Sequence, residues 1–117
     1  ADDTRLGFEV ITSIDADELG LPAIIDRVRA RVGNKPVYVS IDIDVLDPAF
    51  APGTGTPEMG GLNSRELLTL IRSLAAVNVI GADIVEVSPQ YDHAQITGIA
   101  AANLAYELIT ILARSKK

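Results

Sequence analysis

Two aspartates stand two positions apart at the end of an apolar, β-branched segment. The segment begins at Val37 and leads through Ile41 into Asp42 and Asp44. Side chains at positions i and i+2 of a strand point to the same face, so Asp42 and Asp44 are expected to project together. Two such carboxylates repel each other unless a cation lies between them, and hard divalent cations prefer oxygen ligands. The pair therefore indicates a Mg²⁺ or Mn²⁺ site, with a plain polar strand end as the alternative.

A loop rich in glycine and proline follows the aspartates over residues 45–63. Proline fixes φ and glycine permits positive φ, so the loop is expected to take a rigid and unusual path. Such a loop could hold the hydroxyls of Thr54 and Thr56 against a ligand, or it could simply connect two elements. It is not a phosphate-binding loop, because no Gly-Lys-Ser/Thr sequence follows its glycines.

A third acidic side chain, Glu86, lies near the end of the next apolar segment. If that segment is a strand, Ile84 and Glu86 share one face, while Asp83, Val85 and Val87 share the other. An acidic side chain among valines is costly unless it is paired. A guanidinium group pairs with a carboxylate through two hydrogen bonds, so the partner of Glu86 is either a cationic substrate or a local arginine.

The single histidine, His93, follows Tyr91 and Asp92 in a short polar segment. A lone histidine without a defined partner is more often a surface residue than a general base, so the sequence assigns no catalytic residue. Tyr91 and Asp92 are expected to fix the loop at the start of the last helix.

Alternating strand and helix patterns surround these residues. Apolar residues at spacings of three and four, cap signals and β-branched runs predict strands over 8–12, 37–41 and 79–87, and helices over 22–32, 64–74 and 94–114. The run at 37–41 is nearly continuous in apolar residues, as in a strand buried on both faces. This order predicts an α/β fold of three layers (α-β-α) around a parallel sheet, with ligands beyond the carboxyl ends of the strands.

Composition narrows the classes of function. A length of 117 residues fits one domain, and the net charge of −6 is a poor match for nucleic acid or an anionic membrane surface. No apolar run reaches about 18 residues, so no membrane span is expected. The absence of cysteine excludes disulfides, thiolate catalysis and cysteine-ligated zinc. The chain begins without methionine and shows no signal peptide, so its compartment stays open, with the cytoplasm as the default.

These residues together resemble a known family. The stretch 40–58 is similar, nearly residue for residue, to the C-terminal signature of the manganese-dependent ureohydrolases, the arginase and agmatinase family. A second match covers 81–87. The continuation 88–94, together with Thr97 and the alanine-rich segment after it, resembles agmatinases more than arginases. The resemblance covers essentially the whole chain.

The resemblance implies roles for four residues. Asp42 and Asp44 match ligands of a binuclear Mn²⁺ site, Thr56 matches a position close to the bound substrate or its hydroxide nucleophile, and Glu86 matches the carboxylate that binds the substrate guanidinium. The implied reaction is hydrolysis of agmatine to putrescine and urea. Guanidinobutyrate and other guanidino acids stay open as substrates.

The chain also departs from the family pattern. The remaining metal ligands of the family lie in a Gly-Gly-Asp-His segment and an Asp-Ala-His-x-Asp segment, and neither occurs here, while His93 matches no ligand position. Residues 1–117 therefore resemble the C-terminal part of a ureohydrolase domain whose N-terminal half is absent. We expect the isolated chain to be inactive or very weakly active. An uncovered sheet edge and helix face predict self-association, as a homo-oligomer, or a partner chain that replaces the missing half.

Three other interpretations compete with this one. A phosphatase of the haloacid-dehalogenase type also uses Asp-x-Asp after a strand, but the residues after Asp44 do not continue its Asp-x-Asp-x-Thr motif. A receiver-like signalling domain needs a lysine at the end of a late strand. The only lysines are Lys35, Lys116 and Lys117, and none of them is at such a place. A non-catalytic assembly module derived from a ureohydrolase is the third.

Overall fold

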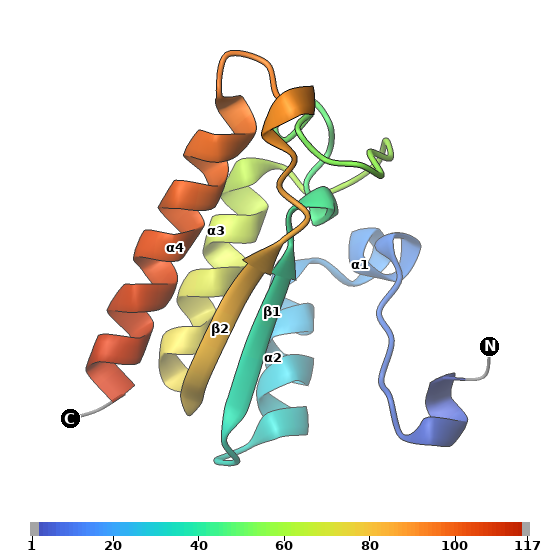
Figure 1. The fold of residues 1–117 in the computed structure, drawn as a ribbon. Helices are drawn as coiled ribbons and strands as arrows, with labels where there is room; N and C mark the ends of the chain where they lie inside the picture. Colours follow the sequence, from blue (N-terminus) through green and yellow to red (C-terminus); the bar gives the residue numbers. More distant parts are fainter. Residues whose placement is uncertain (1–2, 116–117) are drawn as a thin grey trace.

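The computed structural model describes residues 3–115, which form two parallel strands and four α-helices joined by short 3₁₀ turns (Figure 1). The α-helices and strands, in chain order, are α1 (Ser13–Leu19), α2 (Leu21–Val32), β1 (Val37–Asp42), α3 (Ser64–Ser73), β2 (Val79–Val85) and α4 (Ile96–Ser115). The 3₁₀ turns span Asp3–Leu6, Ile43–Val45, Leu74–Ala76 and Pro89–Tyr91. The α/β class and the parallel sheet that the sequence predicts are confirmed.

Strands β1 and β2 are neighbours and run in the same direction, so their carboxyl ends lie at one edge. Ile41 is opposite Ile84, and Asp42 is opposite Val85. The chain beyond each strand therefore leaves the sheet at the same place. This relationship brings the segment after Asp42 close to Glu86, which directly follows β2.

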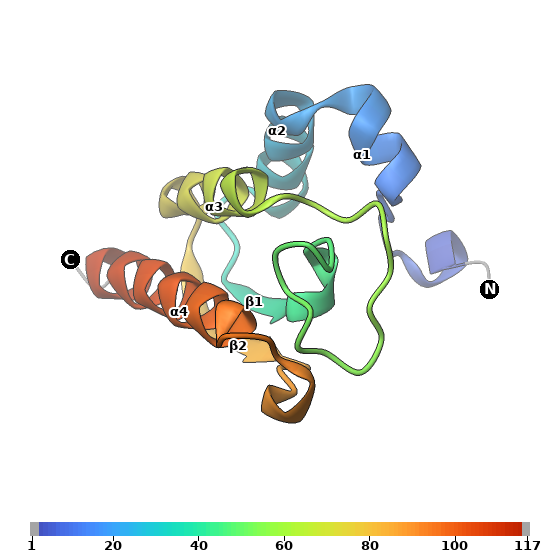
Figure 2. The same cartoon turned by 90° about the horizontal axis from the view of Figure 1, so that it is seen from above.

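The core lies against one face of the two strands. In Figure 1 the strands stand in front of α2 and α3, with α4 along β2, and Figure 2 shows the same arrangement from above. Alternate residues of β1 face this core. The large apolar core side chains are Ile41, Ile43, Leu46, Leu67, Ile71, Leu74, Val77, Val79, Leu104, Leu108 and Ile111.

The other face of the strands is exposed, which corrects the expectation that β1 is buried on both faces. Tyr38 is 61% exposed and Ile80 is 64% exposed, and Ser40 and Asp42 on the same side of β1 are also exposed. The helices of residues 3–115 cover only the opposite face. Of the three expected layers, the described residues form two.

A local sequence signal accounts for the start of α3. The Asn63 side chain accepts a hydrogen bond from the backbone N–H of Glu66, and the Glu66 carboxylate accepts one from the backbone N–H of Asn63. These two bonds form a capping box, which satisfies two backbone donors that the first turn leaves free. At the other end, Arg72 pairs with Glu107 of α4 with an Nε to Oε1 distance of 2.9 Å.

The predicted strand over 8–12 is wrong, because the structure has an irregular, largely exposed segment there. Phe8 and Val10 both face solvent. A short β-prone segment forms a strand only beside another strand, and neither β1 nor β2 pairs with it. The polar residues that follow form α1 instead, which begins with a capping box between Thr12 and Asp15.

Helix α4 is long and apolar enough to cross a membrane by length and composition alone, with a mean hydropathy of 1.6 over Ile96–Arg114. A search for uninterrupted apolar runs overlooks it, because single polar residues interrupt the sequence. Its Leu104, Leu108 and Ile111 belong to the core, although only 22% of the span is buried. Core helices pass the same test, so this signal is weak.

Candidate metal and substrate site

Asp42 and Asp44 lie together, but not for the reason that strand alternation gives. Strand β1 ends at Asp42, and Asp44 lies in the 3₁₀ turn Ile43–Val45. Ile43 is fully buried and so is Leu46, three residues later, and a 3₁₀ turn places such residues on one side. The turn thereby leaves Asp44 free to approach Asp42. The backbone N–H of Asp44 donates to Oδ1 of Asp42 over 3.2 Å.

The electrostatic surroundings of Asp42 are acidic. Asp42 is exposed as a residue, but slight desolvation of its carboxyl group raises its pKa. The negative charges of Asp44 and Glu86 raise the pKa further, against one lowering hydrogen bond from the backbone of Asp44. The carboxylates of Asp44 and Glu86 therefore lie close enough to repel that of Asp42. Such a field favours a bound cation, or a proton in its place.

Thr56 approaches the aspartates from the glycine- and proline-rich loop. Its hydroxyl donates to Oδ2 of Asp44 over 2.8 Å, although the two residues are 12 positions apart. Thr56 is exposed, so it could also face a ligand. Thr54, the other threonine of this loop, is buried at 3% exposure, and its hydroxyl has no hydrogen-bond partner within residues 3–115. The loop thus presents Thr56, and not Thr54, beside the carboxylates.

Glu86 lies just beyond β2, which ends at Val85 and not at Val87 as the sequence predicts. It is exposed, and its φ is 67°, in the left-handed region that non-glycine residues rarely adopt. The alternation argument, which placed Glu86 beside Ile84 on one face of a strand, therefore does not apply, because Glu86 lies outside the strand. Within residues 5–114 the ion pairs are Arg27 with Glu9 and Arg72 with Glu107, so the alternative of a local arginine partner for Glu86 is not formed.

His93 is exposed and takes no part in this cluster. Its backbone N–H donates to Oδ1 of Asp92 over 2.9 Å. Among the residues that the structure describes, no group of three or more His, Cys, Asp or Glu side chains could hold a metal ion. Asp42 and Asp44 supply oxygen donors of the kind that Mn²⁺ accepts, but they form only part of a ligand set.

Asp47 stabilises the loop that carries Thr56, a role that sequence reasoning missed. One carboxylate oxygen accepts from the N–H of Ala49 and the other from the N–H of Gly60, each over 2.9 Å. These bonds, that from Ala49 first, lower the pKa of Asp47. An Asp-Pro dipeptide at the start of a loop is a turn signal that could have identified it.

Asp92 fixes the start of α4, as the sequence predicts. Its carboxylate accepts backbone hydrogen bonds from Thr97 and Gly98 over 3.0 Å each, in addition to that from His93. Burial alone would raise the pKa of Asp92, but these bonds and one from the Thr97 hydroxyl lower it to about 2. The side chain of Tyr91 is exposed, and its backbone N–H donates to the carbonyl oxygen of Ser88 rather than to α4.

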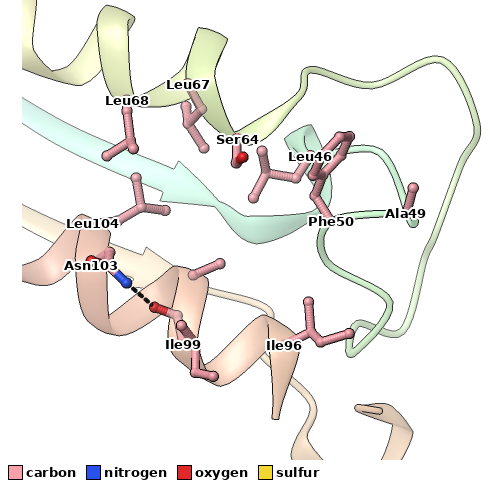
Figure 3. A pocket seen from close by; sticks show the side chains of 11 residues that line it. Leu46, Ala49, Phe50, Ser64, Leu67, Leu68, Ile96, Ile99, Asn103 and Leu104 are labelled. Atoms are coloured by element: carbon pink, nitrogen blue, oxygen red, sulfur yellow. Dashed lines mark hydrogen bonds between the residues drawn. The ribbon is translucent and has the colours of Figure 1, made fainter. Parts of the chain in front are cut away.

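An apolar groove of about 370 Å³ lies between the glycine- and proline-rich loop over 45–63, α3 and α4. Figure 3 shows Phe50 and Leu46 of the loop on one side, with Ile96 and Ile99 of α4 on the other. None of the acidic site residues lines it. The groove is therefore separate from the carboxylate cluster.

Comparison with known proteins identifies the family. The model of the arginase family matches residues 1–110. The putative agmatinase 1 of Schizosaccharomyces pombe is 50% identical over 113 residues, which are 97% of this chain and 29% of that protein. The agmatinase of Escherichia coli is 48% identical over 110 residues, which are 94% of this chain and 36% of that protein.

A solved structure gives the same result. The proclavaminate amidinohydrolase of Streptomyces clavuligerus matches with a TM-score of 0.93 and 50% identity, over 97% of this chain and 38% of that one. The chain thus spans about a third of the length of the relatives that it matches. The family model, the sequence identities and the shared fold lead to one conclusion: this chain belongs to the arginase family.

Proposed function

We propose that this chain supplies part of the active site of a manganese-dependent enzyme that hydrolyses a guanidino group, with agmatine as the leading substrate. One observation carries the proposal. Three separate segments bring Asp42, Asp44, Thr56 and Glu86 to the carboxyl edge of the strands, where Thr56 binds Asp44 and Glu86 acts on the pKa of Asp42. The names of the relatives, agmatinase and amidinohydrolase, support the same reaction class.

Asp42 and Asp44 would hold manganese together with ligands from outside this chain. Their oxygen atoms suit the ion, and their closeness is unfavourable without a cation. A pair of such ions, when bound, lowers the pKa of water enough to supply hydroxide near neutral pH. The hydrogen bond from Thr56 restrains the Asp44 carboxylate in one orientation.

Glu86 would bind the guanidinium of the substrate. A carboxylate and a guanidinium form two parallel hydrogen bonds, which fix the plane of the cation as well as its place. The backbone conformation of Glu86 (φ 67°) turns its side chain away from the strand pattern, and residues held in rare conformations cluster at functional sites. In this arrangement Glu86 orients the guanidinium carbon toward the nucleophile.

Guanidinobutyrate and other guanidino acids are the competing substrates. A carboxylate at the far end of such a substrate requires a cationic or hydrogen-bonding partner, whereas the amine of agmatine requires an acidic one. The acidic cluster around Asp42 belongs to the guanidinium end, which both kinds of substrate share, so agmatine leads because the relative from Escherichia coli is named an agmatinase. Rates of urea release from both substrates decide between them.

A partner is part of the proposal, because two carboxylates do not complete a binuclear site. Tyr38 and Ile80 leave an apolar patch on the bare side of the strands, and Tyr106 and Ile109 leave another on α4. Apolar patches of this kind mark association surfaces. We propose that the chain self-associates or joins a polypeptide that carries the remaining ligands. The alternative is a non-catalytic assembly module, which would associate through the same apolar patches but would take no part in guanidine hydrolysis.

A chimera tests the function. The matched segment of the Escherichia coli agmatinase is replaced by this chain, and urea release from agmatine is measured with added Mn²⁺ beside the isolated chain. We expect the chimera to be active and the isolated chain to be inactive or nearly so. The change Glu86→Gln should raise KM, while Asp26→Asn on the exposed side of α2 is the matched control.

Two results would contradict the proposal. A folded chimera that binds manganese but releases no urea from any guanidino compound would favour the assembly module. An isolated chain that matches the chimera in rate would refute the claim that it holds only part of the site.

A further inference from the structure

Gly53 joins the two segments that carry Thr56 and Glu86. Its N–H donates to the hydroxyl of Thr97 over 2.8 Å, and its carbonyl oxygen accepts from the N–H of Ser88 over 2.8 Å. Gly53 lies three residues before Thr56, and Ser88 lies two residues after Glu86. The position of Gly53 therefore sets how far apart these two segments stand.

Thr97 anchors Gly53 to the start of α4. The Thr97 side chain is completely buried, and its hydroxyl accepts from Gly53 while it hydrogen-bonds to the Asp92 carboxylate. The same carboxylate accepts from the backbone N–H groups of Thr97 and Gly98. A carboxylate at a helix N-terminus is favoured by the helix dipole, so Asp92 stays ionised and keeps the Thr97 hydroxyl oriented.

There is no space for a side chain at Gly53. A Cβ atom built there would lie 2.8 Å from Cβ and 3.0 Å from Cα of Asp92, and 2.9 Å from the Thr97 hydroxyl oxygen. Backbone and short side chains surround the position, so the neighbours cannot rotate away. The φ of Gly53 is not in the left-handed region, so backbone conformation does not require glycine there. Glycine is needed because the neighbouring atoms approach too closely for a side chain.

We propose that Thr97 and Gly53 are positioning residues that set the distance between Glu86 and the Thr56–Asp44 pair. This inference rests on the proposed function, because it concerns the same site. We call Gly53, Ser88, Asp92 and Thr97 the clamp. The clamp holds the Glu86 carboxylate at a fixed distance from Thr56 and Asp44. None of the clamp residues is required to touch substrate.

The rate of the reaction is expected to depend on the distance between Glu86 and the Thr56–Asp44 pair. A displacement of about 1 Å between reacting groups can lower a rate by about 10²-fold. A loosened clamp leaves Glu86 able to bind the guanidinium, so KM is expected to change little while kcat falls. Loss of the Glu86 carboxylate itself removes binding and raises KM. The split between kcat and KM thus separates positioning from binding.

The first test uses the chimera described above. The change Thr97→Val removes the hydroxyl at nearly constant shape, Thr97→Ser retains it, and Gly53→Ala forces the loop away from α4. We expect Thr97→Val and Gly53→Ala to lower kcat by about 10-fold or more, with KM changed less than about twofold. Thr97→Ser should restore most of kcat. Gly98→Ala is the matched control, because a Cβ there meets only an ordinary contact at 3.8 Å.

The second test measures the clamp without activity. In the 117-residue chain, the amide protons of Gly53 and Ser88 should exchange slowly with solvent. Thr97→Val should accelerate the exchange of both, whereas Thr97→Ser and Gly98→Ala should not. Gly53→Ala should accelerate exchange at Ser88, which keeps the test independent of any one variant that fails to fold.

The outcomes separate the two claims. Unchanged kcat in folded Thr97→Val and Gly53→Ala chimeras would overturn the clamp as a positioning device, and so would unchanged amide exchange in both. A parent chimera that folds and binds manganese but is inactive, with amide exchange that behaves as expected, would refute the proposed function and with it the positioning role, although the hydrogen bonds of the clamp would stand. Loss of kcat that Thr97→Ser restores, together with faster exchange in Thr97→Val, would support both.

Discussion

The hydroxyl of Thr56 donates a hydrogen bond of 2.8 Å to Oδ2 of Asp44. This contact connects the glycine- and proline-rich loop to the turn that follows β1. A hydroxyl that restrains a metal-ligating carboxylate affects metal affinity without touching the metal, because the ligand is then already oriented before the ion binds.

Removal of that hydroxyl should weaken manganese binding. In the chimera, Thr56→Val is expected to raise the Mn²⁺ concentration for half-maximal urea release by about 10- to 100-fold, the usual effect of losing a group that orients a ligand. Thr56→Ser keeps the hydroxyl and should stay near the parent value. An unchanged manganese dependence in Thr56→Val would show that the contact has no influence on the metal.

The pKa of Asp92 predicts how stability depends on pH. The folded chain holds this pKa at about 2, below the value of about 3.9 for an unfolded aspartate. The stabilisation is therefore present above pH 4 and is lost as pH falls toward 2. Denaturant midpoints from pH 6 to 2 should fall less steeply in Asp92→Asn than in the parent chain. Asp26→Asn should retain the parent slope, and an equal slope in Asp92→Asn would contradict the assignment.

Gly61 is predicted to tolerate no side chain. A Cβ atom at this position would lie 2.5 Å from the backbone nitrogen of Asp47 and 2.8 Å from the carbonyl oxygen of Val45. Backbone atoms cannot move aside cheaply, so Gly61→Ala should lower the free energy of unfolding by about 1–3 kcal/mol. Gly55→Ala, with open space around its Cβ, should change it by less than about 0.5 kcal/mol. Equal denaturant midpoints for the two variants would contradict the packing described here.

The bare side of the strands should drive association. Sedimentation of the isolated chain is expected to show species larger than a monomer at high concentration, because Tyr38 and Ile80 are exposed there. Ile80→Lys should shift the distribution toward monomer, whereas Thr69→Lys on the exposed side of α3 should not. A monomer at all concentrations would count against both the homo-oligomer and this surface.

Local signals in the sequence were sufficient for most of the elements. The Asn63 capping box, the proline near the start of α2 and the β-branched run of β1 are contacts and preferences within a few residues, so they can be read directly. The segment over 8–12 has the same kind of β preference but no neighbouring strand among the described residues. Pairing is a long-range property, and a single short segment does not reveal it.

The site was predicted in part. Its residue types were visible, and Asp42, Asp44 and Thr56 do lie together, but a 3₁₀ turn and not strand alternation brings Asp44 to Asp42. The positive φ of Glu86 has no signal in its residue type. The need for glycine at Gly53 arises from the approach of α4, 44 residues away, so no local pattern could identify it.

The central claim is that the aspartate pair binds manganese for guanidine hydrolysis, and the double variant Asp42→Ala, Asp44→Ala tests it most directly. In the manganese-loaded chimera we expect this variant to lose bound metal and to release urea more than about 10²-fold more slowly, beyond the loss of a group that only orients a ligand. A folded double variant that kept its manganese and its full rate of urea release would contradict the account.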